Sequence, residues 1–74
     1  MKRDEISSFE YHDNPLDKGK SIRFLRELFS EGGGRFIVED EFTGLNMVCS
    51  SYDFGWQVFS SWVYERCHSP RWEN

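Results

Sequence analysis

The residues of this sequence best suited to chemistry lie side by side near its C-terminal end. Cys67 stands between Arg66 and His68, and positive charge beside a thiol lowers its pKa and favours the nucleophilic thiolate. Neighbouring residues on a helix point in different directions, so His68 is poorly placed to take the Cys67 proton. A chain of 74 residues also has little room for a water-excluding pocket of about 300–1,000 Å³. We therefore predict no catalytic residue and a protein that is not an enzyme.

Cysteine and histidine side chains could also bind zinc. The available ligands are His12, Cys49, Cys67 and His68. None of them form the short-spaced cysteine or histidine pairs that zinc sites use, and the adjacent pair is hard to aim at one tetrahedral ion. We predict no metal and no cofactor, and two free thiols that act as small buried hydrophobes.

The charge of the chain is divided unevenly between its halves. The net charge is −4, yet residues 1–35 carry seven basic and seven acidic side chains. Residues 36–74 carry six acidic side chains against only Arg66 and Arg71. A surplus of acid disfavours direct binding to nucleic acid and to anionic membranes.

No apolar run approaches the roughly 20 residues that a bilayer-spanning helix needs. The charged start of the sequence is not followed by an apolar stretch, so we predict no signal peptide and a cytoplasmic location. The length predicts a single domain over residues 1–74, with residues 1–5 and 70–74 flexible.

The first half of the sequence predicts a strand followed by a helix. Residues 6–12 alternate loosely and favour a strand. Asn14-Pro15-Leu16-Asp17 is typical of a helix start, and an apolar stripe with helical spacing follows it. Gly32-Gly33-Gly34 is expected to end this helix. The members of the stripe are Ile22, Phe24, Leu25, Leu28 and Phe29.

The second half predicts a hairpin and then an element of uncertain type. Arg35–Phe42 and Leu45–Ser50 favour two strands joined by a tight turn at Thr43-Gly44. Residues 54–67 fit a helix with Asp53 as its N-cap, whereas their aromatic content favours strands. We favour the helix, because an uninterrupted strand of that length is unusual.

These elements predict an α+β fold in the order β-α-β-β-α, with a small antiparallel sheet packed by two amphipathic helices. The predicted core is apolar and largely aromatic. Its members are Phe24, Leu25, Leu28, Phe29, Phe36, Val38, Met47, Trp56, Phe59 and Val63.

Acidic and aromatic side chains supply the predicted partner-binding residues. They are Glu39, Asp40, Glu41, Asp53, Tyr64 and Trp72. Carboxylates can pair with basic groups of a partner, and tyrosine and tryptophan are the usual anchors of protein interfaces. Our first hypothesis is a small acidic protein-binding factor that occludes a basic surface on a larger protein. An inhibitor, an immunity or antitoxin-like protein, or a phage or mobile-element accessory protein would have this character.

Two alternatives remain open. Lys20, Arg23 and Arg26 would form a basic strip on the predicted first helix, which could bind nucleic acid. The aromatic side chains could instead be buried in a homodimer, with the chain acting as a structural subunit.

Overall fold

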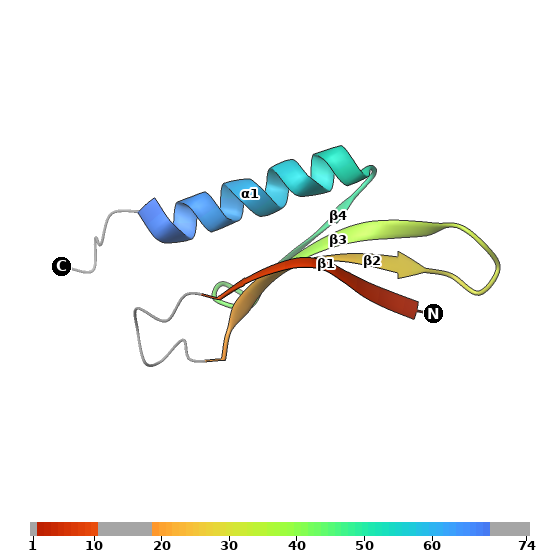
Figure 1. The fold of residues 1–74 in the computed structure, drawn as a ribbon, viewed down its shortest axis with the longest axis horizontal. Coiled ribbons are helices and arrows are strands. Elements are labelled where there is room, and N and C mark those ends of the chain that lie inside the picture. The colour runs from red at the N-terminus through yellow and green to blue at the C-terminus, as the bar shows by residue number, and fades with distance from the viewer. Residues whose placement is uncertain (1, 11–18, 69–74) are drawn as a thin grey trace.

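The computed structural model describes residues 2–10 and 19–68 of the chain. Four strands are followed by one helix: β1 (Lys2–Glu10), β2 (Ser21–Leu28), β3 (Gly34–Asp40), β4 (Leu45–Cys49) and α1 (Tyr52–His68). The strands form one antiparallel sheet in the order β1-β2-β3-β4, and α1 lies across one of its faces (Figure 1). The α+β class is confirmed, but the predicted order and the predicted pair of helices are wrong.

The helix predicted for the first half is replaced by β2, a central strand of the sheet. Ile22 and Phe24 face α1, while Leu25 lies on the opposite face, and all three are buried. Because both faces of β2 are covered, apolar residues occur on both, and the alternation expected of a half-buried strand disappears. The combined pattern of the two faces imitates the spacing of a helix. The predicted helix start at residues 14–17 lies outside the described residues.

The glycines expected to end that helix form a hairpin loop instead. Gly32 and Gly33 have φ angles of 98° and 77°, a region that glycine enters without strain. Phe29 and Gly33 close the loop, since the Phe29 amide donates to the Gly33 carbonyl oxygen at 3.0 Å. The loop connects β2 to β3 and projects beyond the start of α1 (Figure 1).

The first strand is longer than its sequence suggested. β1 begins at Lys2 and pairs with β2 along its length, so residues 2–5 belong to the sheet. The register shifts between Glu5 and Ser7. Such a bulge lets one extra residue turn toward a neighbouring layer, and Ile6 packs against the core at this point.

The second hairpin is confirmed. The Asp40 carboxylate accepts hydrogen bonds from the backbone amides of Phe42 at 2.8 Å and Thr43 at 3.3 Å. Gly44 has a φ of 80°, and its amide donates to the Asp40 carbonyl oxygen at 2.8 Å. Asp40 therefore builds the turn that the Thr43-Gly44 pair predicted.

The helix favoured for residues 54–67 is also confirmed, with a different cap. The Ser51 hydroxyl accepts a hydrogen bond from the Phe54 amide at 3.1 Å. Ser51 is therefore the N-cap, and Asp53 lies in the first turn, where its charge complements the helix dipole. The prediction of Asp53 as the cap was wrong by two positions.

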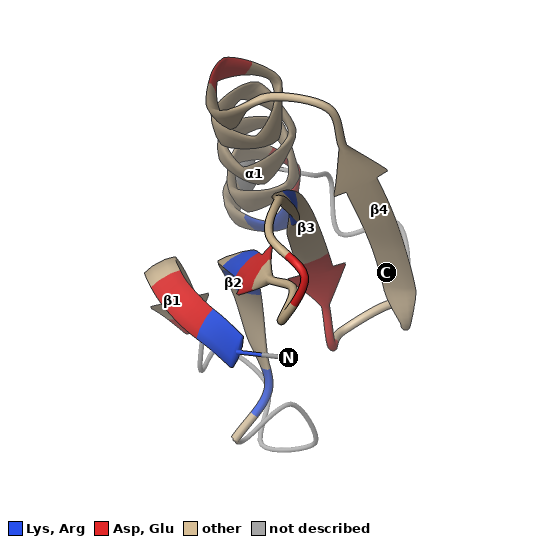
Figure 2. Cartoon of the chain, turned by 90° about the vertical axis from the view of Figure 1, so that its right-hand side faces the viewer, with Lys and Arg blue, Asp and Glu red and all other residues tan. Residues whose placement is uncertain are grey.

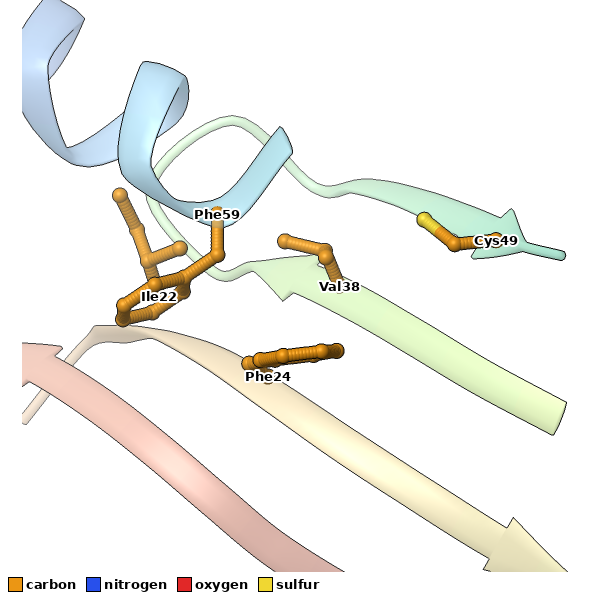
Figure 3. Close-up of a cluster of buried hydrophobic side chains, with 5 residues drawn as sticks. All are labelled: Ile22, Phe24, Val38, Cys49 and Phe59. Atoms are coloured by element: carbon orange, nitrogen blue, oxygen red, sulfur yellow. The ribbon is translucent and has the colours of Figure 1, made fainter. Parts of the chain in front are cut away.

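The core lies between α1 and the sheet (Figure 3). Phe24 is fully buried at its centre, and its ring centroid lies 5.5 Å from that of Tyr52 and 6.2 Å from that of Phe59. Gly55 permits this close approach, because a Cβ atom there would lie 2.5 Å from the Phe24 ring. The other members of the buried cluster are Ile22, Val38 and Cys49.

The predicted core is right only in part. Phe24, Leu25, Val38 and Phe59 are buried, and Phe36 and Val63 are partly buried against the cluster. Four other predicted members are exposed: Leu28, Phe29, Met47 and Trp56. Leu28 and Phe29 lie at the β2–β3 hairpin, which extends past the helix that would have covered them (Figure 1). Met47 is exposed because it lies on an edge strand.

Candidate protein-binding face

The acidic run that the sequence singled out is engaged within the chain. Glu39 accepts hydrogen bonds from Arg3 at 2.6 Å and from Arg23 at 3.0 Å. Glu41 accepts from the Ser21 amide at 2.9 Å and pairs with Arg23 at 3.4 Å. Asp40 is buried and builds the turn described above. These three carboxylates stabilise the sheet that carries them.

The pairs of Glu39 belong to a wider network on the face of the sheet opposite α1. Glu27, on β2, is bound on one side by Arg3 and on the other by Arg35, each at 2.8 Å. Arg3 therefore links β1 to both Glu27 on β2 and Glu39 on β3. Leu25 and Ile37 face each other across β2 and β3, at a position between Glu27 and Glu39, and both are buried. We define Arg3, Arg23, Glu27, Arg35, Glu39 and Glu41 as the arginine–glutamate network.

The network changes the acid–base properties of two of its members. The hydrogen bond from Arg35, aided by the one from Arg3, outweighs the effect of burial and lowers the pKa of the Glu27 carboxyl. The hydrogen bonds to Glu39 and then to Glu27 raise the pKa of Arg3. Glu27 thus favours its charged form in the fold more strongly than in the unfolded chain.

We expect a matching dependence of stability on pH. A carboxyl whose pKa is lowered by folding stabilises the fold above its unfolded pKa of about 4.3. That contribution is lost as the pH falls through the folded pKa. Glu27→Gln should therefore lower the melting temperature at pH 7, and the difference from the wild type should shrink steadily below about pH 4.

Thermal melts followed by circular dichroism between pH 3 and pH 7 would measure this difference. Glu65→Gln is a suitable control, because Glu65 is exposed on α1 and should leave the melting temperature nearly unchanged throughout. A gap between Glu27→Gln and the wild type that stays the same at both ends of the range would contradict the role of the network.

The basic strip considered for nucleic-acid binding does not form one surface. Arg23 lies on the network face, whereas Arg26 points to the other side of β2 and pairs with Asp4 at 3.3 Å. Lys20 precedes the strand. The strip depended on a helix at these positions, and a strand sends Arg23 and Arg26 to opposite faces.

The two edges of the sheet differ sharply in charge. β1 carries Lys2, Arg3, Asp4, Glu5 and Glu10, whereas no charged residue occurs from Thr43 to Tyr52. Figure 2 shows β4 without a basic or acidic residue, whereas β1, at the opposite edge of the sheet, carries both. Charged side chains are a common protection of edge strands against further pairing, and β4 lacks this protection.

Exposed apolar side chains of β4 lie on both faces of the sheet, and Asn46 is the polar residue of the strand. Leu45 and Met47 share the face of α1 and are 58% and 39% exposed. Val48 is 56% exposed on the opposite face, where it pairs with the buried Ile37. The apolar strip that runs under the arginine–glutamate network therefore ends in an exposed side chain at the edge.

The flank of α1 on the side of β4 extends this apolar surface, and the other flank does not. Tyr52 and Trp56 lie on the flank that contacts Phe24 of β2. The opposite flank begins with Phe54, which helical geometry places on the side of β4. Phe54 is 45% exposed. These exposed apolar side chains lie around the β4 edge of the sheet, on both of its faces. We define Leu45, Met47, Val48 and Phe54 together as the β4 face.

The remaining predicted anchors lie elsewhere. Tyr64 is 63% exposed on the outer side of α1, and Asp53 is exposed in the first turn. Trp72 lies outside the described residues. The sequence reasoning missed the β4 face, although the run without charge between residues 43 and 52 was a visible signal for it.

The cysteines are separated in the structure. Cys49 is buried beside the start of α1, and this burial raises the pKa of its thiol. Cys67 is exposed near the end of α1, about 18 Å along the helix from Gly55. Within the described part of the chain, no group of three potential metal ligands comes together.

Comparison with known proteins returns no match to a family model, a curated protein or a solved structure. α1, the helix of the described residues, is not apolar enough over a sufficient length to cross a membrane.

Proposed function

We propose that this chain is a small non-enzymatic protein-binding module whose binding surface is the β4 face. The observation that carries the proposal is an uncharged edge strand with exposed apolar side chains on both of its sides. An unpaired strand edge offers a row of backbone donors and acceptors, which an extended segment of another chain can pair with. The neighbouring apolar side chains add burial to those backbone hydrogen bonds.

The position of the β4 face in the fold supports the proposal. The turn at its start is held by Asp40, and the helix after it is capped by Ser51. β3 fixes its inner edge through a continuous register. A surface held on three sides loses little conformational freedom on binding, which favours affinity.

Occlusion of a basic partner by residues 39–41 is the weaker form of a protein-binding function. Glu39 and Glu41 already pair with Arg3 and Arg23, and Asp40 is buried. A partner would have to replace these bonds before it gained any of its own. We therefore assign binding to the β4 face and a stabilising role to the acidic run.

Affinity capture with matched variants tests this assignment. Val48→Lys adds a charge at an exposed position of the β4 face, the kind of residue that blocks edge pairing. Tyr64→Lys makes a similar change at a comparably exposed position on the outer side of α1. We expect a protein that is retained by the wild type and by Tyr64→Lys and is lost with Val48→Lys.

Circular dichroism would establish that both variants fold, as their exposure leads us to expect. Equal recovery by the wild type and Val48→Lys, or a loss confined to Tyr64→Lys, would overturn the assignment of the β4 face.

A further inference from the structure

We propose that the partner of the β4 face is a second copy of this chain, and that two β4 strands pair antiparallel to form one continuous sheet. This inference rests on the proposed function and names the occupant of that surface. The two copies would be related by a two-fold axis perpendicular to the sheet, because that is the symmetry of adjacent antiparallel strands.

The distribution of charge favours self-pairing. In a two-fold strand pair, each residue faces a residue of the same strand, so a charged edge would bring like charges together at a cost. β4 has no charge to oppose. The acidic residues of β3 directly beside it are Glu39 and Asp40. Glu39 is held by two arginines and Asp40 is buried in its turn. Although the chain has a net charge of −4, the β4 edges of two copies would therefore repel each other only weakly.

Exposed apolar side chains of β4 lie on both faces of the sheet, and a further strand with the same pattern would cover them. Val48 of each copy would extend the strip formed by Leu25 and Ile37 across the new junction. With the two Val48 residues opposite each other, Met47 of each copy would face Cys49 of the other copy on the face of α1. A strand that is buried on both faces is expected to be apolar throughout, as β4 nearly is.

The helices fit this arrangement. A two-fold axis perpendicular to the sheet places both copies of α1 on the same face, one on each side of the junction. The flank that bears Phe54 is turned toward β4 and therefore toward the axis. The two Phe54 rings would cover the Met47 and Leu45 side chains between them. The other edge strand, β1, offers no comparable surface, because five of its residues are charged.

Sedimentation equilibrium of the full chain between about 1 μM and 1 mM, the range of weak association, tests the inference. We expect the mass to rise with concentration from 8.8 kDa toward twice that value. Val48→Lys should raise the dissociation constant at least about 100-fold, because it opposes lysines across the junction. Gln57→Lys, which adds the same charge on the exposed outer side of α1, should leave the constant within about 3-fold of the wild type.

A constant mass of 8.8 kDa across this range would overturn self-pairing. So would a dimer that Val48→Lys leaves intact. If the chain stays monomeric but captures a different protein in a manner sensitive to Val48→Lys, the proposed function stands and the second copy is rejected. If neither self-association nor capture depends on Val48, both proposals fall.

Discussion

Replacement of Phe24 by alanine is expected to lower the free energy of unfolding by about 3–5 kcal/mol, the usual cost of removing a buried aromatic ring. Phe24 is fully buried and contacts the rings of Phe36, Tyr52, Trp56 and Phe59. The gap cannot close, because β2 holds one side of it and α1 the other. A chain of this length has a total stability of about 4–11 kcal/mol, so the variant should be partly or fully unfolded at 37 °C.

Phe29→Ala is the matched control for this prediction. The sequence placed both phenylalanines in the core, but Phe29 lies at the β2–β3 hairpin and is 36% exposed. Its ring is 5.9 Å from the Arg35 guanidinium carbon. We expect a loss of about 1 kcal/mol. Urea denaturation of both variants would measure the difference, and equal losses would mean that residues 21–28 do not form a central strand.

A second large effect is expected at Gly55, where α1 comes closest to the sheet. A Cβ atom at this position would lie 2.5 Å from Phe24 Cε1 and 3.6 Å from the Cβ of Cys49. Phe24 has no room to move, because four other rings surround it. Gly55→Val should cost about 3 kcal/mol or more through overpacking. Gly55→Ala should cost less, because its better helix propensity returns about 1 kcal/mol.

Ser60→Val provides the comparison, since Ser60 is exposed on the same helix. There the substitution should change the free energy of unfolding by only about a few tenths of a kcal/mol. Chemical denaturation at 25 °C gives these values directly. A Gly55→Val variant that is as stable as the wild type would mean that α1 does not rest on Phe24.

The part of the fold that could be predicted from the sequence is the part with local signals. Thr43-Gly44 marked the β3–β4 turn, and the length of the aromatic segment after Asp53 favoured a helix over a strand. Both predictions needed only neighbouring residues. The helix cap was misplaced, because serine and aspartate are nearly equal as caps and only the Ser51–Phe54 bond separates them.

β2 was missed because its burial depends on tertiary partners. Leu25 is buried on the face of the sheet that carries the arginine–glutamate network, and the side chains of that network come from three different strands. Arg3 and Glu39 are 36 residues apart, and nothing in their local sequence pairs them. For the same reason, the acidic run was predicted to be a solvated patch. The sequence does not show which arginines lie beside its carboxylates.

The β4 face was within reach of sequence reasoning in one respect. A chain in which 30% of residues are charged has no charge from Thr43 to Tyr52, and the hairpin prediction already covered most of that stretch. What the sequence lacked was the position of this strand at an edge. Only the strand order makes an uncharged strand an exposed one.

Hydrogen exchange of the backbone amides tests the proposed binding role of the β4 face most directly. The free chain would be compared with the chain in complex with its partner, or with the chain itself at high concentration. We predict added protection at residues 45–49 and at the start of α1, with no change along β1 or across residues 39–41. Protection confined to β1, or to the acidic run, would contradict the assignment of binding to the β4 face.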